Sequence, residues 1–165
     1  MSMDFNAGEI LEIAQQIERN GARFYRLAAK EADKPDERDL FLELAAMEEE
    51  HEGVFAEMKN GLSDTEWEST TFDPHGEGAA YLRAMAGDQV FGLKMDPSDL
   101  LEQLESTEGI LRKAIELEKD SIIFYVGMID MVPERLGRDK VNHIIKEEMG
   151  HIVTLSRKIE ARQTS

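Results

Sequence analysis

Hydrophobic residues recur along the chain at alternating steps of three and four positions, which is the spacing of one face of an α-helix. This period predicts four long helices, over about residues 6–32, 36–60, 107–131 and 136–161. Two of the stripes share one form, in which a Glu and a His interrupt an apolar face: Phe41, Leu44, Glu48, His51, Phe55 and Met58, and then Val141, Ile144, Glu148, His151 and Leu155.

Capping and helix-breaking residues set the expected ends of these helices. Asn6 can cap the first helix, with Glu9 as its reciprocal partner three residues on. Pro35 ends the first helix and can open the second, because proline is tolerated only in a first helical turn. Gly61 is placed to cap the second helix, and Pro133 ends the third.

The connection between the second and third helices, residues 62–106, lacks a sustained period and is rich in Gly and Pro. Short helices are predicted within it over residues 78–86 and 98–105. A connection of this length fits a crossover strap, which would let the third helix run parallel to the second. The sequence therefore predicts an all-α fold, a four-helix bundle with a long crossover between helices two and three.

The chain contains an internal repeat whose two copies lie one hundred residues apart. Each copy supplies a lone Glu on one helix and a Glu-x-x-His pair on the next. The residues that recur are Ala14, Glu18, Phe24, Tyr25, Glu48 and His51, which return as Ala114, Glu118, Phe124, Tyr125, Glu148 and His151. Helix bundles use this set of inward side chains to hold two metal ions between their helices.

The predicted ligands are acidic and imidazole groups on otherwise apolar helix faces. A Glu and a His three residues apart point the same way from successive turns, and burying them unpaired is costly unless a cation compensates. The alternative, that they lie on a solvated face, is disfavoured by their apolar neighbours. We expect His51 and His151 to bind one metal each and Glu48 and Glu148 to bridge the metals. Glu18 and Glu118 would complete the coordination, and two divalent cations would balance the four carboxylates.

The kind of metal follows only in part from these residues. Carboxylate and imidazole ligands suit iron, manganese or zinc better than copper(I), which prefers sulfur. Ligand type alone does not choose among those three metals.

Two tyrosines and two small residues accompany the lone glutamates. Tyr25 and Tyr125 lie seven residues after Glu18 and Glu118, on the same helix face. They could hydrogen-bond a ligand carboxylate or act as redox-active phenols, or they could be core aromatics whose hydroxyls are satisfied locally. The small residues Gly21 and Ser121 could leave space beside the metals for oxygen, peroxide or water, or could simply allow tight packing.

The remaining polar residues near the ligands are interpreted as mostly solvated. Of the acidic neighbours of the Glu-x-x-His pairs, one could orient a ligand His; these neighbours are Glu49, Glu50, Glu52 and Glu147. His75 in the strap and His143 off the inward stripe of the fourth helix are predicted to be surface histidines.

Composition narrows the class of protein. The 165 residues, 41% hydrophobic and 33% charged, are typical of one globular domain. A formal charge of −16 argues against nucleic acid and anionic membranes as partners. The absence of cysteine excludes thiol catalysis, iron–sulfur clusters and a rubredoxin-type iron site within this sequence. With no apolar span and no basic region before Arg19, we expect a cytoplasmic protein.

Four segments resemble the ferritin-like di-iron carboxylate proteins, and most closely their rubrerythrin branch: IAQQIERNGARFY, LAAMEEEHEGVF, AIELEKDSIIFY and IIKEEMGHIVTL. The resemblance implies a ferritin-like bundle that binds two iron ions, with zinc or manganese as alternatives. It assigns the ligand role to Glu18, Glu48, His51, Glu118, Glu148 and His151. Members of the family reduce peroxide or oxygen, and their relatives oxidise and store iron.

Two departures from the rubrerythrin pattern shape the expected activity. Rubrerythrins carry a rubredoxin-type domain, and this sequence has no cysteine for one, so electrons would come from an external donor, rubredoxin-like or another reductase. Rubrerythrins also carry an extra Glu one turn after the third helix's ligand, a position that is Ser121 here. From the resemblance we expect a peroxide- or oxygen-reducing di-iron protein, whereas the two departures favour the first of its alternatives. The alternatives are iron binding and oxidation without peroxide turnover, and a non-enzymatic zinc-binding bundle.

A homodimer is also expected, because the long helices of such bundles often bury one another's outer faces.

Overall fold

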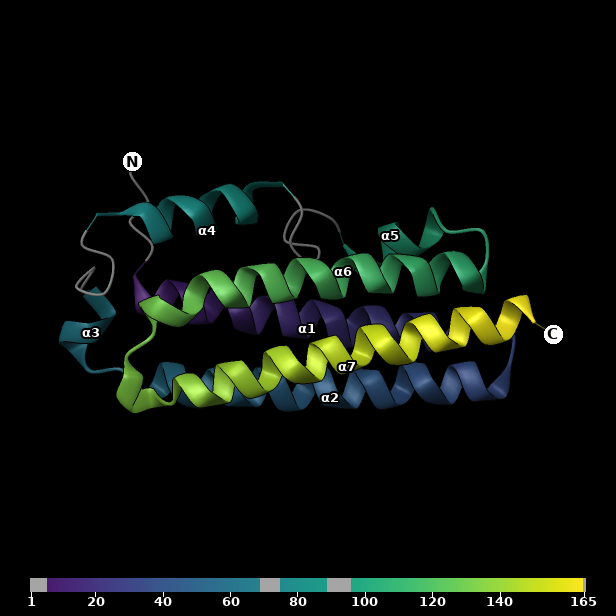
Figure 1. Ribbon diagram of the computed structural model, residues 1–165, viewed down its shortest axis with the longest axis horizontal. Helices are drawn as coiled ribbons and strands as arrows, with labels where there is room; N and C mark the ends of the chain where they lie inside the picture. The colour runs from purple at the N-terminus through teal and green to yellow at the C-terminus, as the bar shows by residue number, and fades with distance from the viewer. Residues whose placement is uncertain (1–5, 69–74, 89–95, 165) are drawn as a thin grey trace.

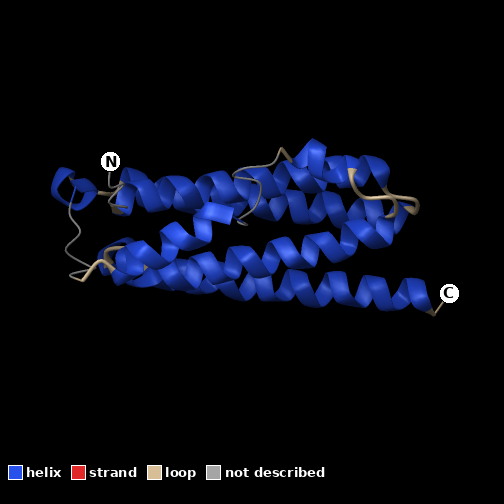
Figure 2. Cartoon of the chain, turned by 90° about the horizontal axis from the view of Figure 1, so that it is seen from above, coloured by secondary structure: helices blue, strands red, loops and turns tan. Residues whose placement is uncertain are grey.

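The computed structural model describes residues 6–68, 75–88 and 96–164, and four long helices dominate it (Figure 1). These helices are α1 (Ala7–Glu31), α2 (Pro35–Asn60), α6 (Thr107–Met128) and α7 (Arg138–Gln163). Figure 2 shows helices joined by loops, and no strand occurs in the described ranges. The predicted all-α bundle is confirmed.

The helix ends follow their capping residues. The Asn6 side chain accepts from the Glu9 amide at 2.8 Å, and the Glu9 carboxylate accepts from the Asn6 amide at 3.2 Å. Ser106 caps α6 by accepting from the Gly109 amide at 3.1 Å. The third helix is shorter than predicted, because the chain tightens at Ile129 into a 3₁₀ turn, η1 (Ile129–Met131).

The turn into α7 also differs from the prediction, which started the fourth helix at residue 136. A second 3₁₀ turn, η2 (Glu134–Leu136), precedes Gly137, whose φ of 93° lies in the left-handed region that favours glycine. The helix α7 begins at the next residue, Arg138.

The bundle consists of two antiparallel hairpins, α1 with α2 and α6 with α7 (Figure 1). The crossover between them returns the chain to the other end of the bundle, so α6 runs parallel to α2, as the long strap predicts. Three short helices lie in this connection: α3 (Asp64–Glu68), α4 (Glu77–Asp88) and α5 (Pro97–Glu102). The sequence indicated α4 and α5 but not α3, and α5 ends three residues earlier than predicted.

The helix α4 docks on α6 at Gly127. The ring of Tyr81 lies where a Cβ atom on residue 127 would stand, so only glycine allows this close approach. The Tyr81 hydroxyl donates to the Ile123 carbonyl at 3.3 Å, and Leu82 beside it is completely buried. The strap is therefore attached to the bundle by packing as well as by the chain.

Aromatic rings pack in the bundle interior on both sides of its middle. Tyr25 stacks on Phe41 with ring centroids 6.1 Å apart, and Tyr125 packs against Phe55 at 5.1 Å. All four rings are completely buried. They enclose the polar middle of the bundle in apolar layers.

A polar network connects α2, α6 and α7 with the α1–α2 turn at one end of the bundle. The buried Glu37 of α2 pairs with Arg162 of α7, whose guanidinium also lies 3.4 Å from Asp33 in the α1–α2 turn. The Thr107 hydroxyl at the start of α6 donates to the same Asp33 carboxylate at 2.9 Å. Arg162 therefore compensates a carboxylate that the fold removes from water.

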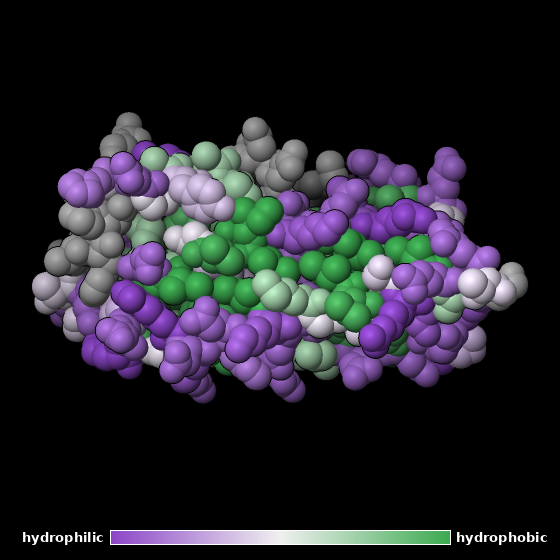
Figure 3. All heavy atoms as spheres, in the orientation of Figure 1, coloured by the Kyte–Doolittle hydropathy of each residue, from purple (hydrophilic) through white to green (hydrophobic). Residues whose placement is uncertain are grey.

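Figure 3 shows hydrophobic surface along the face formed by α6 and α7. Val126 of α6 and Met149 and Val153 of α7 are each about half exposed. In the homodimer expected from the sequence, which stays a prediction, a second copy would cover this surface. Within the described ranges, none of the helices is long and apolar enough to cross a membrane.

Replacing Arg162 should destabilise the fold, because Glu37 would be left buried without its cation. We expect Arg162→Leu to lower the free energy of unfolding by about 2 kcal/mol, measured by equilibrium urea denaturation. Arg112→Leu is the control, since its i,i+4 pair with Glu108 is exposed and should contribute no more than about 0.5 kcal/mol. Equal losses in the two variants would contradict a special role for Arg162.

Candidate metal centre

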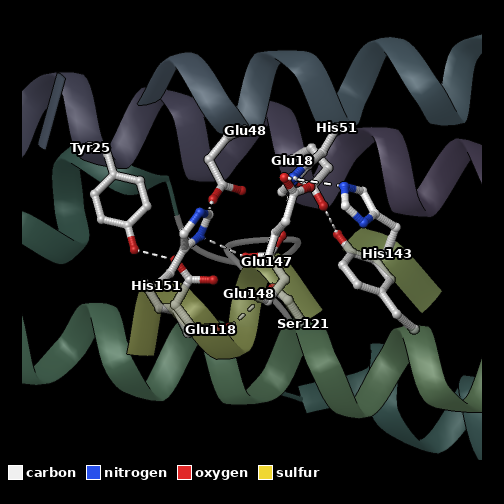
Figure 4. Close-up of polar contacts among 12 residues, drawn as sticks. Glu18, Tyr25, Glu48, His51, Glu118, Ser121, His143, Glu147, Glu148 and His151 are labelled. Atoms are coloured by element: carbon white, nitrogen blue, oxygen red, sulfur yellow. Dashed lines mark hydrogen bonds and ion pairs between the residues drawn. The ribbon is translucent and has the colours of Figure 1, made fainter. Parts of the chain in front are cut away.

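The six predicted metal ligands come together in the middle of the bundle (Figure 4). One lone Glu comes from α1 and one from α6, and the Glu-x-x-His pairs come from α2 and α7. All six side chains are buried, with at most 4% of any residue exposed: Glu18, Glu48, His51, Glu118, Glu148 and His151.

The six residues form two overlapping groups, each able to bring four ligand atoms within 4.8 Å of one another. The groups are Glu18, Glu48, His51 and Glu148, and then Glu48, Glu118, Glu148 and His151. Glu48 and Glu148 belong to both groups, as expected for bridging ligands. Each group takes its lone Glu and its His from one hairpin and shares the bridging carboxylates.

Both imidazoles turn their Nδ1 atoms toward the carboxylates. The His51 Nδ1 lies 2.8 Å from one oxygen of Glu148 and 3.5 Å from Glu18. The His151 Nδ1 lies 3.0 Å from the other oxygen of Glu148 and 3.4 Å from both Glu48 and Glu118. The two rings stack with their centroids 6.0 Å apart. Glu148 therefore lies between the two histidines.

These histidine–carboxylate pairs are not aligned as hydrogen bonds, and several side-chain atoms of the site are buried without any hydrogen-bond partner. They are Glu18 Oε2, Glu48 Oε1, His51 Nδ1, Glu118 Oε2, both Glu148 carboxylate oxygens and His151 Nδ1. Each such atom costs about 1–3 kcal/mol if nothing satisfies it. Because the atoms converge and are all oxygen or imidazole nitrogen, they fit two cations of the iron, manganese or zinc kind.

Without a metal, the site must hold protons. Burial would lower the pKa of His51, but its contacts with Glu148 and Glu18 outweigh burial and raise that pKa to about 11. The same balance, with Glu118 and Glu148, raises the pKa of His151 to about 10. Burial and the neighbouring carboxylates also raise the pKa of Glu48 and of Glu118. Protons on these groups therefore offset negative charge of the four carboxylates when no metal ion is bound.

The two tyrosines connect the two hairpins at the site through hydrogen bonds. Tyr25 of α1 donates its hydroxyl hydrogen bond to Glu118 of α6, and Tyr125 of α6 donates to Glu18 of α1. Burial, followed by the adjacent carboxylates, raises the pKa of both phenols, so they stay protonated and act as donors. Of the alternatives that the sequence left open, each tyrosine therefore hydrogen-bonds a predicted ligand carboxylate, and its hydroxyl is not satisfied by a local partner.

The small residues beside the lone glutamates, Gly21 and Ser121, make different contacts. A Cβ atom on Gly21 would stand 2.9 Å from Glu48 Oε2, so the Glu48 carboxylate fills the space that this glycine leaves. The structure thus favours tight packing over a pocket for a small molecule at Gly21. Ser121 is buried, and its hydroxyl donates to the Leu117 carbonyl at 3.1 Å.

Among the acidic neighbours, Glu147 contacts a predicted ligand. One oxygen lies 2.9 Å from His51 Nε2, and the other lies 3.5 Å from His143 Nε2. The sequence analysis named Glu147 among four acidic residues of which one could orient a ligand His, but helical spacing could not single it out, because Glu147 and His51 belong to different helices. His143 and His75 are exposed, as expected of surface histidines.

Comparisons with known proteins agree with this geometry. The model of the family described as Rubrerythrin matches residues 9–159. A crystal structure from Thermotoga maritima, with the provisional description of a ferritin-like diiron-carboxylate protein, is similar at a TM-score of 0.74 and 26% identity. The similarity covers 98% of this chain and 97% of that chain. The comparison with curated proteins found no match.

A methyl group on residue 21 should weaken metal binding, because the Glu48 carboxylate would have to move. We expect Gly21→Ala to bind Zn²⁺ or Mn²⁺ about tenfold more weakly, measured by isothermal titration calorimetry. Gly53→Ala is the matched control, since Gly53 lies on the same helix as Glu48 and a Cβ there meets nothing within 4 Å. Undiminished affinity in Gly21→Ala would contradict the placement of Glu48.

Metal affinity should rise with pH, because a metal must displace the protons held by His51 and His151. Below the raised pKa values of about 11 and about 10, both imidazoles start protonated. The affinity should fall about tenfold per pH unit for each proton displaced as the pH is lowered. Titrations in buffers of different ionisation enthalpy would count the released protons, and binding without proton release would refute this description.

Proposed function

Since the chain belongs to the rubrerythrin family, whose model matches residues 9–159, we propose that it is a di-iron protein that reduces hydrogen peroxide or oxygen. One observation carries the proposal: the buried carboxylate and imidazole atoms converge in two overlapping groups and lack other partners. Two divalent ions would neutralise the four carboxylates and satisfy these atoms.

The provisional description of one structural neighbour supports iron as the metal. The Thermotoga maritima structure is described as a diiron-carboxylate protein, and it is similar along nearly the whole of this chain. In the proposed arrangement Glu18 and His51 would hold one ion, Glu118 and His151 would hold the other, and Glu48 and Glu148 would serve both. Iron held there would supply two electrons, which with two protons convert hydrogen peroxide into two molecules of water.

The surrounding residues prepare the site for this chemistry. The Tyr25 and Tyr125 hydroxyls each hold a proton against one carboxylate oxygen of Glu118 and Glu18, respectively. The other oxygen of each of these carboxylates stays free of hydrogen bonds and available to a metal. The buried rings on both sides give the site apolar surroundings, which strengthens the charge interactions within it.

The electrons would come from a separate donor. The sequence contains no cysteine, so it holds no rubredoxin-type iron centre to pass electrons to the site. We therefore propose a rubredoxin-like protein or another reductase as the external reductant.

One observation favours an alternative activity, the oxidation of ferrous iron without peroxide turnover. Ser121 occupies the position of the extra Glu expected from the resemblance to rubrerythrins, and its hydroxyl is engaged with the Leu117 carbonyl. The site therefore offers four carboxylates, without an additional one on α6 to follow a change in metal charge.

Peroxide turnover separates these functions. We expect iron-loaded protein to consume many equivalents of hydrogen peroxide when a chemical reductant is supplied, followed by a peroxide electrode. Glu148→Ala should lose both its iron and the turnover, because Glu148 belongs to both ligand groups, whereas the exposed Glu43→Ala should keep both. Oxidation that stops after about two irons per chain would support the alternative function, since a two-metal site holds no more. Failure to bind iron would refute both.

A further inference from the structure

The two histidines of the site differ in what their second ring nitrogen contacts. His51 Nε2 lies 2.9 Å from a carboxylate oxygen of Glu147 and can donate its proton to it. His151 Nε2 is buried without a hydrogen-bond partner. The two halves of the site therefore match in their predicted ligands. They differ in whether the second ring nitrogen of the histidine has a hydrogen-bond partner.

The internal repeat explains the difference. The residue one hundred positions before Glu147 is Met47, on the helix that carries Glu48. A thioether is at best a weak hydrogen-bond acceptor and carries no charge. The second repeat provides Glu147 as a partner for His51. At the matching position the first repeat has Met47, which offers His151 no carboxylate.

This contact affects metal binding through the imidazole. A neutral His whose Nδ1 faces the metal carries its remaining proton on Nε2. A carboxylate that accepts this proton fixes the tautomer, holds the ring in place and makes Nδ1 a stronger ligand. His51 receives this support, whereas His151 would have to bury an N–H group without an acceptor.

We propose that Glu147 is a positioning residue that makes the Glu18–His51 half of the site bind its metal ion more tightly than the Glu118–His151 half, so that the two metal positions fill in order. The inference rests on the proposed function only in requiring that the site bind two metal ions. It does not depend on whether peroxide is reduced.

The surroundings of Glu147 set the size of the effect. Its side chain is 33% exposed, so water screens its charge, and the expected gain lies near the lower end of the 10–100-fold range of such contacts, at about tenfold. It lines a surface cavity of about 450 Å³ together with His51, His143, Lys140 and Glu50. The His51 half thus also borders a cavity through which an ion could approach.

Variants that keep one half-site test the proposal, with Co²⁺ as the probe and its visible absorption as the signal. His151→Ala retains the His51 half, and His51→Ala retains the other. We expect Glu147→Gln to weaken Co²⁺ binding about tenfold in the His151→Ala background and to leave it unchanged in the His51→Ala background. Glu50→Gln is the control, because it removes the same charge from the same cavity.

Equal weakening in both backgrounds, or none in either, would overturn the proposal. So would a Glu50→Gln loss as large as that of Glu147→Gln, since the effect would then be one of general charge. If the otherwise unmodified chain failed to bind two Co²⁺ ions, the proposed function itself would fail.

A second measurement avoids half-site variants, whose folding could suffer. In the otherwise unmodified chain, the first equivalent of Co²⁺ should produce a paramagnetically shifted imidazole N–H proton signal in the NMR spectrum. Glu147→Gln should speed the exchange of that proton with water and leave the signal of the second equivalent unaltered. A first signal that is insensitive to Glu147→Gln would overturn the proposal.

Discussion

The rest of the structure depends on one constraint, which is that four carboxylates and two imidazoles are buried together with too few hydrogen bonds among them. Such a core is stable only if positive charge enters it, as protons or as metal ions. The raised pKa values of the two histidines show the first solution, and the convergence of the unpartnered atoms fits the second. The aromatic layers and the network around Arg162 let the helices hold this unfavourable middle in place.

Much of this arrangement could be predicted because its cause is local. Glu48 and His51 share a helix face by their spacing alone, and the repeat then indicates the partners Glu148 and His151. The ends of α1 followed from Asn6 and Pro35 for the same reason, since capping involves only nearby residues. The tightening of the chain after Met128 could not be read from local spacing, because the hydrophobic period continues through the 3₁₀ turn.

Beyond the six predicted ligands, the sequence could not show which residues of different helices meet. The approach of Glu147 to His51 depends on how α7 lies against α2, and no spacing within either helix encodes it. The crossed pairs, Tyr25 with Glu118 and Tyr125 with Glu18, likewise depend on the packing of α1 against α6. Gly21 was recognised as small, but that its neighbour is the Glu48 carboxylate emerges only in three dimensions.

The joining of two similar hairpins in one chain also has an evolutionary consequence. A single hairpin paired with its own copy around a two-fold axis could offer the same six ligands, but every substitution would then appear twice. A covalently linked pair escapes this restriction, because each copy can mutate alone. The contrasts of Glu147 with Met47 and of Ser121 with Gly21 are differences that a symmetric ancestor could not have held. Because one chain carries both hairpins, substitutions can adjust each metal position separately.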